Sequence, residues 1–335
     1  MALEGLSGFR YAQTMKTFGS VPEPPFEDPE EQLRSWGQLW GCDNDVGRLR
    51  KVLVHRPGQE MSIVDRSKYL PEIDAFGDLE SGWYWQHNTI PELADMQAQH
   101  DAMTAALLAK GVEVVHLEGV EAPHIKACYT RDSVIAVKGG VVVSRMAPRV
   151  RRGEEVCVTR TLGKLGVPII RTITGAGMIE GGSFAWINSR TAVVGRSIRV
   201  NDEAIRQLDE VLRGQGVELI VVDLRGYDIH IDGSFVMIDS DLALVAAEGL
   251  PFTFLERLKA LKVRTVEITP QDDPWIVNCL AVAPGDVIMP PGASNRTLDR
   301  LGELGVAITT IAYDKMQTNG GSLHCSTGPL LRDPV

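Results

Sequence analysis

Five side chains with catalytic chemistry stand just ahead of short apolar runs or near the end of the chain. Asp132 directly precedes SVIAV, and Glu180 precedes GGSFAWI. His230 and Asp232 precede GSFVMI, and Cys325 lies in NGGSLHCST near the C-terminus. Charged groups at the mouths of buried strands cost folding free energy unless they are paired or bind something. We therefore expect these residues to converge on one site.

A cysteine, a histidine and three carboxylates suit nucleophilic chemistry. A thiolate is the strongest side-chain nucleophile near neutral pH, so Cys325 is the expected nucleophile. His230 can give a proton to a leaving group and then activate water, and Glu180 can orient that histidine. Asp132 and Asp232 would repel a thiolate unless a cation lies between them, and a planar guanidinium matches carboxylates well. The set predicts attack on the central carbon of a guanidino group.

The same residues also permit a zinc site, because His230, Asp232, His324 and Cys325 carry N, O and S ligands. His324 and Cys325 are adjacent in the sequence, however, and share one strand or loop that is poorly suited to joint ligation. We therefore predict neither a metal nor a cofactor.

The elements that would position these side chains recur along the chain. Runs rich in β-formers start at residues 112, 167, 217, 263 and 306. The runs at 112, 167, 217 and 306 follow a glycine, which can end a helix in a left-handed conformation. The run at 263 follows Lys262 instead. Upstream of each helix lie two apolar segments split by a turn, as in SVIAV-KGG-VVVSRM. The predicted unit is strand, turn, strand, helix, strand.

Helix starts and unit boundaries follow from local patterns. Thr89, with Glu92 three residues later, is typical of a capping box, and Asn201 can cap a later helix. A fifth unit begins at Arg48 and carries a long insertion at residues 57–88 before its helix. Five similar units favour a closed ring, a five-bladed α/β propeller, over an open α/β sheet with coincidental spacing.

The repeat also sets the expected domain organisation. Residues 1–40, which include PEPPFEDPEEQ, fall outside the repeat and are expected to form an N-terminal arm. Residues 41–335 are expected to form a single catalytic domain.

Composition narrows the classes of partner. The 335 residues include 34 Lys and Arg against 44 Asp and Glu, a net charge of -10, which argues against nucleic-acid and anionic-membrane surfaces. No apolar run reaches the length of a membrane span. The 5 cysteines are widely spaced without a CxxC motif, so we expect free thiols and a cytoplasmic protein. The acidic balance suits a small cationic substrate.

The motifs together resemble a known superfamily. They are Tyr129-Thr130-Arg131-Asp132, Glu180-Gly181-Gly182, His230-x-Asp232 and Gly320-Gly321-x-x-His324-Cys325. This set resembles the guanidino-group-modifying enzymes, which include arginine deiminases, dimethylarginine dimethylaminohydrolases and amidinotransferases. The resemblance covers residues 41–335, and the fold that it implies is the five-bladed pentein propeller.

The resemblance also implies roles for individual residues. Cys325 resembles the nucleophile that forms a covalent intermediate, His230 the proton-transfer group and Glu180 its carboxylate partner. Asp132 and Asp232 resemble guanidinium-binding aspartates, and Arg199 matches an arginine that holds the substrate α-carboxylate. Two further residues in the motifs, Arg131 and Asn278, are expected to help bind substrate.

Departures from the family patterns bear on the reaction. Amidinotransferases typically have Asp where this chain has Glu180, which favours hydrolysis, and dimethylaminohydrolases usually lack Asp at position 232. Arginine deiminases usually have Asp and Pro where this chain has Ser183 and Ser133. The leading hypothesis is hydrolysis of arginine or a related guanidino compound, which releases ammonia or an amine and a ureido product. Amidino transfer to an acceptor amine and a non-catalytic guanidino-binding protein are the alternatives, and a homo-oligomer is left open.

Overall fold

The computed structural model describes residues 23–335. The chain divides into two compact units, Met1–Leu39 and Trp40–Val335. In the first unit, helix α2 (Pro29–Trp36) begins at Asp28, whose carboxylate accepts hydrogen bonds from the N–H groups of Glu30 and Glu31. The expected roles of an arm at 1–40 and a catalytic domain at 41–335 stay predictions.

The second unit contains five three-stranded sheets, among the described residues, that share one topology. In each sheet the middle strand pairs antiparallel with one neighbour, here called the inner strand, and parallel with the other. In the order inner, middle and outer, the strands are β18 (Gly328–Arg332), β1 (Leu49–Val54), β5 (Glu113–His116); β6 (Val134–Val137), β7 (Gly140–Val143), β8 (Ile169–Thr172); β9 (Phe184–Asn188), β10 (Thr191–Arg196), β11 (Glu218–Asp223); β12 (Phe235–Asp239), β13 (Leu242–Val245), β14 (Arg264–Glu267); β15 (Leu280–Ala283), β16 (Asp286–Met289), β17 (Ala307–Thr310).

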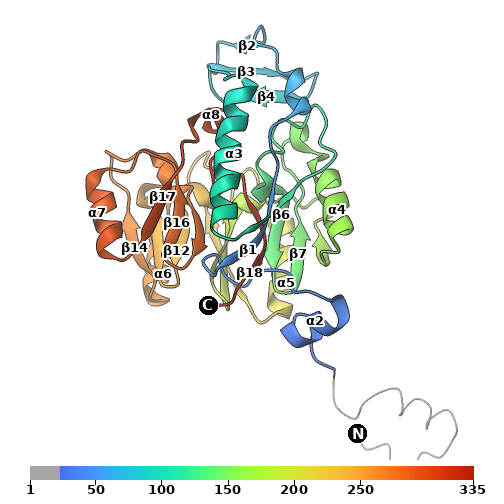
Figure 1. Cartoon of the computed structure of the whole chain (residues 1–335), viewed down its shortest axis with the longest axis vertical. Helices are drawn as coiled ribbons and strands as arrows, with labels where there is room; N and C mark the ends of the chain where they lie inside the picture. The colour runs from blue at the N-terminus through green and yellow to red at the C-terminus, as the bar shows by residue number, and fades with distance from the viewer. Residues whose placement is uncertain (1–22) are drawn as a thin grey trace, which may run out of the picture. The chain divides into compact units, whose positions relative to one another are not determined.

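The C-terminal strand completes the first sheet. β18 pairs antiparallel with β1, so the end of the chain supplies the inner strand of the sheet that contains β1 and β5 (Figure 1). Sequence patterns predicted β1 and β5 but gave no place to β18, because its partner lies at the other end of the chain. This pairing places the segment that carries Cys325 directly before an inner strand.

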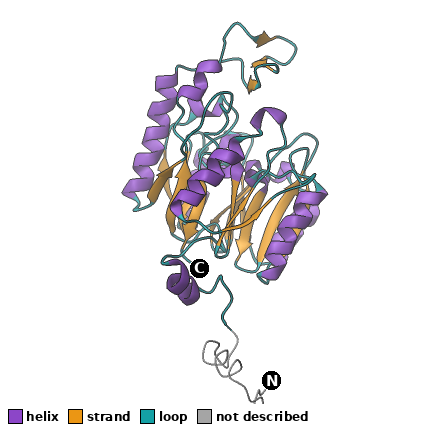
Figure 2. Cartoon of the chain, turned by 90° about the vertical axis from the view of Figure 1, so that its right-hand side faces the viewer, coloured by secondary structure: helices purple, strands orange, loops and turns teal. Residues whose placement is uncertain are grey.

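One helix connects the middle and outer strands of each sheet, on the outer flanks of the strands (Figure 2). The helices are α3 (Leu93–Ala109), α4 (Glu154–Leu165), α5 (Asp202–Gly214), α6 (Phe252–Ala260) and α7 (Asn295–Glu303). The expected cap is confirmed at α5, where the Asn201 side chain accepts from the N–H of Ala204. At α3 the expected cap is wrong: the cap position is Glu92, and the Thr89 hydroxyl donates to Asn88 instead.

The chain leaves each helix through a left-handed residue. Gly111, Gly166, Gly216 and Gly305 have φ values between 71° and 83°, as the sequence predicts. Lys262 occupies the equivalent position after α6 with φ 62°. A residue with a Cβ is disfavoured there by about 1–2 kcal/mol, so this turn is held by its surroundings at some cost.

The insertion at residues 57–88 forms a sheet of its own. A short 3₁₀ turn, η1 (Gln59–Ile63), is followed by β2 (Tyr69–Leu70), β3 (Ala75–Asp78) and β4 (Trp83–Trp85). These three strands pair antiparallel and lie beyond one end of the five sheets (Figure 1). β4 therefore brings Tyr84, with Gln86 just after it, to that end of the sheets.

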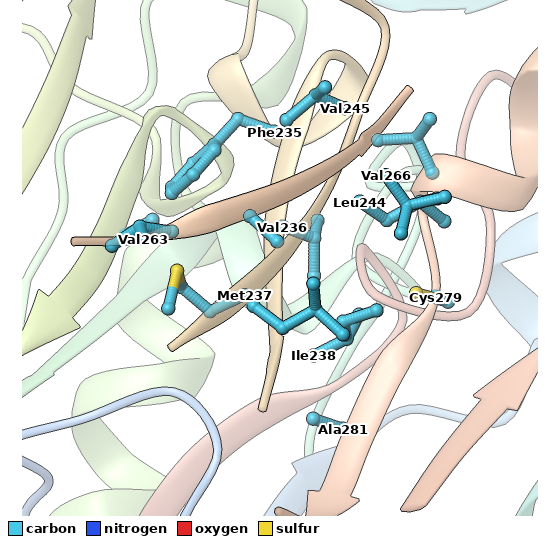
Figure 3. Close-up of a cluster of buried hydrophobic side chains, with 14 of the residues drawn as sticks. Phe235, Val236, Met237, Ile238, Leu244, Val245, Val263, Val266, Cys279 and Ala281 are labelled. Atoms are coloured by element: carbon cyan, nitrogen blue, oxygen red, sulfur yellow. The ribbon is translucent and has the colours of Figure 1, made fainter. Parts of the chain in front are cut away.

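The core lies between the sheets and their helices. Phe235, Met237 and Ile238 of β12 pack with Val263 and Cys279 in one apolar cluster (Figure 3).

Inner strands of different sheets also contact one another: β6 with β18, β9 with β12, and β12 with β15. None of the sheets in residues 23–335 closes on itself, and the expected five-bladed propeller is not confirmed beyond a mixed α/β fold. Within the same residues no helix combines the length and apolarity that crossing a bilayer requires.

Candidate active site

Short 3₁₀ turns before the inner strands carry most of the expected site residues. Asp132 lies in η2 (Thr130–Ser133), and Glu180 and His230 are the cap residues of η4 (Gly181–Ser183) and η5 (Ile231–Gly233). Asn278 ends η7 (Pro274–Val277). Each of these turns contacts the next. Repetition of one turn at equivalent strand ends therefore brings distant residues together.

Two glycines permit the turns to approach closely. A Cβ on Gly181 would lie 2.1 Å from the carbonyl oxygen of Arg131. A Cβ on Gly182 would lie 2.7 Å from His230 Nδ1 and 2.9 Å from Asp132 Oδ1. The Glu180-Gly181-Gly182 motif thus has a steric reason: only glycine leaves room for the histidine and the aspartate.

His230 is held between two carboxylates. Its Nε2 donates to Glu180 Oε2 at 2.7 Å, and its Nδ1 lies 3.6 Å from Asp132 Oδ1. Burial acts to lower the pKa of His230, but the negative charges of Asp132 and Glu180 outweigh burial and raise that pKa above its usual value. The imidazole is therefore disposed to carry a proton, as a general acid must.

Glu180 is fully buried and accepts from three groups. Besides His230, Arg199 Nη1 donates to its two oxygens at 2.9 and 3.0 Å, and the N–H of Ala147 donates at 3.2 Å. Burial alone would raise the pKa of Glu180, but the hydrogen bond from His230 and the charge of Arg151 hold it well below its ordinary range. Glu180 is thus an ionised carboxylate that fixes the histidine ring.

Cys325 sits in a buried segment beside Asp232. Its thiol donates to Asp232 Oδ2 at 3.7 Å, and the same oxygen accepts from His324 Nδ1 at 2.8 Å. Burial and the charges of Asp232 and Asp132 raise the pKa of the Cys325 thiol well above its ordinary value. Without an added cation, the sulfur therefore rests as a thiol.

Asn278 positions the cysteine instead of facing the cavity. Its Oδ1 accepts from the N–H of Cys325 at 3.3 Å, and its Nδ2 donates to the carbonyl of Asp232, also at 3.3 Å. Its own carbonyl accepts from the N–H of His324 at 3.2 Å. One buried amide thus ties the cysteine segment to η5, although substrate contact was expected.

A small cavity of about 20 Å³ lies where these groups meet. Asp132, Arg199, His230 and Cys325 line it, as do several residues that sequence reasoning missed: Tyr84, Gln86, Lys126, Tyr129, Arg151, Ile229, Asn319 and Gly320. A larger surface groove of about 630 Å³ between β14 and α7 contains none of the expected residues. The chemistry, not the size, marks the smaller cavity as the candidate site.

Buried cations are the main feature that the sequence did not reveal. Arg151 donates to Asp132 Oδ2 at 2.7 Å and to Glu154 at 2.8 and 2.9 Å. Lys126 donates to Asn319 Oδ1 at 2.7 Å and lies 4.1 Å from the centre of the Tyr84 ring. Burial, and then the charge of Arg151, lower the pKa of Lys126 well below its usual value. The one sequence signal for Arg151 was Glu154 three residues later, which is common on any helix start.

Two arginines of the predicted set lie in different surroundings. Arg199 reaches the cavity, where Nη1 holds Glu180 and Nη2 donates to the Tyr84 hydroxyl at 3.3 Å. Arg131 does not line this cavity but a separate, smaller one. The predicted side chains gather around the cysteine and histidine except that of Arg131, whose backbone N–H donates to the Cys325 carbonyl at 3.0 Å. Asp232 contacts the Cys325 thiol but does not line the cavity.

The acidic groups also offer metal-binding atoms. One ligand atom each from Asp132, Glu180 and His230 lie within 4.8 Å of one another. Arg151 donates to Asp132 and Arg199 donates to Glu180, so each of these carboxylates already has one guanidinium partner. The donor set therefore matches cationic organic groups at least as well as a metal, and the prediction of no metal stays a prediction.

Comparison with known proteins identifies the family. Residues 84–332 match the profile of the family described as N,N dimethylarginine dimethylhydrolase, eukaryotic. The chain belongs to this family, within the guanidino-group-modifying superfamily. Asp at position 232, which was expected to point away from such enzymes, does not exclude membership.

The chain is also similar to individual relatives and to a solved structure. The chain is 27% identical over 294 residues to the Bacillus subtilis protein YkgA, covering 87% of this chain and 95% of that protein. It is 24% identical over 247 residues to N(G),N(G)-dimethylarginine dimethylaminohydrolase of Pseudomonas aeruginosa, covering 74% and 93%. A structure of the Pseudomonas aeruginosa enzyme with citrulline shares its fold, with a TM-score of 0.68 and 20% identity over 85% of this chain and 100% of that one.

Proposed function

We propose that this protein is a cofactor-free hydrolase that attacks the guanidino carbon of arginine or a related compound through Cys325. One observation carries the proposal: a single cavity is lined by a thiol, by a histidine 2.7 Å from a buried carboxylate, and by an aspartate. Family membership supports a reaction at a guanidino group, by hydrolysis or by amidino transfer.

Substrate charge has a defined part in this mechanism. Burial raises the pKa of the Cys325 thiol most, and the charges of Asp232 and Asp132 raise it further, so Cys325 is a thiol in the absence of substrate. A guanidinium bound between these two aspartates neutralises them, and the thiol then loses its proton to solvent. Because the nucleophile forms only beside a cation, an uncharged urea analogue is expected to react poorly.

The bond changes follow from the positions of the side chains. The Cys325 thiolate adds to the guanidino carbon, and the bond from that carbon to the leaving nitrogen breaks as His230 donates a proton to it. Ammonia or an amine departs, leaving an amidino group bound to sulfur. His230, held by Glu180, then takes a proton from water as the water oxygen adds to the same carbon. The carbon–sulfur bond breaks, and a ureido product leaves with the thiol restored.

The remainder of the substrate would lie toward Arg199. Its Nη2 donates to the Tyr84 hydroxyl, which also lines the cavity. A substrate carboxylate can take the place of this hydroxyl while Nη1 stays on Glu180. This supports an α-amino acid with a guanidino side chain as the substrate class. Glu180 in place of the Asp typical of amidinotransferases supports water as the acceptor.

The propeller arrangement belongs to the same proposal. Contacts of β18 with β6, β9 with β12, and β12 with β15 support five blades whose inner strands surround one axis. The Trp186 indole of β9 also donates to the carbonyl of Ala136 in β6 at 3.0 Å.

Five free cysteines support the expected reducing cytoplasm.

A product screen tests the function. Arginine, monomethylarginine, asymmetric dimethylarginine and agmatine are incubated with the enzyme, with and without glycine, and ureido, amine and amidino products are quantified by mass spectrometry. Ureido product without need of glycine is expected. Cys325→Ala should abolish turnover, whereas Cys157→Ser, which changes a thiol outside the cavity, should not. A glycine-dependent amidino product would show transfer, and binding without turnover by the intact protein would refute catalysis.

A further inference from the structure

Lys126 is a buried cation of the candidate active site that the proposed bond changes do not use. It lies on the segment that leads into η2, is 4% exposed and lines the cavity. Its ammonium donates to the carbonyl and to Oδ1 of Asn319, which are neutral acceptors, and no carboxylate of residues 23–335 pairs with it. Lysine is rarely buried unless an anion pairs with it. Lys126 therefore lacks a counter-charge that a ligand can bring.

The arginines of the cavity differ from this lysine, because each already has a carboxylate partner. Arg199 donates to Glu180 at 2.9 Å. Arg151 donates to Asp132 at 2.7 Å and to Glu154 at 2.8 Å. Among the described residues, the lysine is thus the lining cation without a carboxylate of its own.

Lys126 and Arg199 both contact the Tyr84 side chain. The Lys126 Nζ lies 4.1 Å from the centre of the Tyr84 ring, and Arg199 Nη2 donates to the hydroxyl of the same ring at 3.3 Å. A substrate carboxylate that takes the place of this hydroxyl would therefore approach both cations. Lys126 would exchange a cation–π contact for an ion pair, which is the stronger interaction in a buried site.

The same surroundings disfavour an ammonium group beside that carboxylate. Asp132 is the one carboxylate among the described residues that lines the cavity, and its proposed part is to receive the guanidinium at the reacting end. An α-ammonium would lie near Lys126 and Arg199 without a carboxylate partner. Like charges repel strongly where water is excluded.

We infer that Lys126 selects guanidino acids whose carboxylate has no ammonium beside it. Either the amino group is absent from the substrate, or an acyl group on the amino nitrogen removes its charge. This inference rests on the proposed function and narrows its substrate class. Lys126 is a specificity-determining residue in this scheme, since it binds the tail of the substrate and takes no part in the bond changes.

A panel of compounds with one guanidino chain tests the selection. 5-Guanidinopentanoate is arginine without its amino group, agmatine is arginine without its carboxylate, and Nα-acetylarginine keeps the nitrogen without its charge. The rate of ureido or amine release should give 5-guanidinopentanoate a kcat/KM about 10- to 100-fold above that of arginine, with agmatine the poorest substrate. Nα-acetylarginine distinguishes the two sources: a kcat/KM near that of 5-guanidinopentanoate supports an acylated substrate, and a lower one supports the free guanidino acid.

Variants of the lysine connect the selection to its charge. Lys126→Met should raise the KM for 5-guanidinopentanoate about 10- to 100-fold with kcat nearly unchanged, and should remove the preference over arginine. Lys126→Arg, which keeps the charge, should retain the preference. Lys164→Met, which alters an exposed lysine of α4 outside the cavity, is the control and should change neither value. If Lys126→Met does not fold, Lys126→Gln takes its place, because its amide can still donate to Asn319.

The outcomes separate this inference from the proposed function. A kcat/KM for arginine equal to or above that for 5-guanidinopentanoate would overturn the inference and leave the hydrolase standing, as would an unchanged preference in Lys126→Met. If no guanidino compound is turned over, the proposed function fails, and calorimetric binding to the intact protein then tests the lysine alone. Arginine bound as tightly as 5-guanidinopentanoate would refute the selection in that case.

Discussion

Replacing Asp232 by Asn should make the cysteine more reactive while turnover is lost. The Asp232 carboxylate lies 3.7 Å from Cys325 Sγ and helps to raise the pKa of that thiol. A unit charge at this separation contributes about 1 kcal/mol in water and about 4 kcal/mol at an effective dielectric constant of 20. Since 1.36 kcal/mol equals one pKa unit, Asp232→Asn should lower the pKa of Cys325 by about 1–3 units.

The assay is alkylation by iodoacetamide across a pH series, because this neutral reagent reports thiolate without needing the cation site. Below both pKa values, alkylation of Asp232→Asn should be about 10- to 1000-fold faster than that of the wild type. Turnover of a guanidino substrate should fall, because one of the two carboxylates that receive the cation is gone. Asp223→Asn, an exposed carboxylate paired with Arg196, is the control and should change neither rate. An unchanged alkylation profile would refute the electrostatic reasoning.

Three further substitutions test separate parts of the site and fold. Glu180→Gln should lower the pKa of His230, measured by NMR, and reduce kcat by about 10²–10⁴-fold. In the wild type, the raised pKa of His230 stabilises the fold below pH 6.5, and this stabilisation is lost as pH rises through the folded pKa. Glu180→Gln should remove this pH-dependent stabilisation. Asn278→Ala should lower kcat about 10-fold or more with KM nearly unchanged, because Asn278 orients Cys325 without lining the cavity; an equal rise in KM would contradict this role. Lys262→Gly should raise the free energy of unfolding by about 0.5–1 kcal/mol in urea titrations, since its φ of 62° suits glycine; a lower stability would contradict the strain.

The repeated units could be predicted because each one is locally encoded. Gly111 and its equivalents end helices by a left-handed turn, and paired apolar segments with short turns specify hairpins whatever their distant partners. The convergence of Asp132, Glu180, His230 and Cys325 followed from their equivalent places in these units. Thr89 failed as a cap because local sequence does not show that its hydroxyl binds Asn88.

What could not be predicted depends on contacts distant in sequence. β18 pairs with a strand at the start of the fold, and Arg151 reaches Asp132 only after two strands and a turn have folded. The sequence around Lys126 does not indicate burial, which results from contacts with the distant residues Asn319 and Tyr84. Arg131 stands beside Asp132 in one motif, yet the 3₁₀ turn directs the two side chains into different cavities.

In the proposed mechanism, Cys325 becomes bonded to the guanidino carbon of the substrate. Acid quenching within the first turnover, followed by peptide mass spectrometry, measures this directly. We expect the peptide containing Cys325 to gain the mass of the substrate less its leaving amine, and to lose that gain as ureido product forms. Rapid turnover with an unmodified Cys325 peptide at every quench time, and full activity in Cys325→Ala, would contradict it.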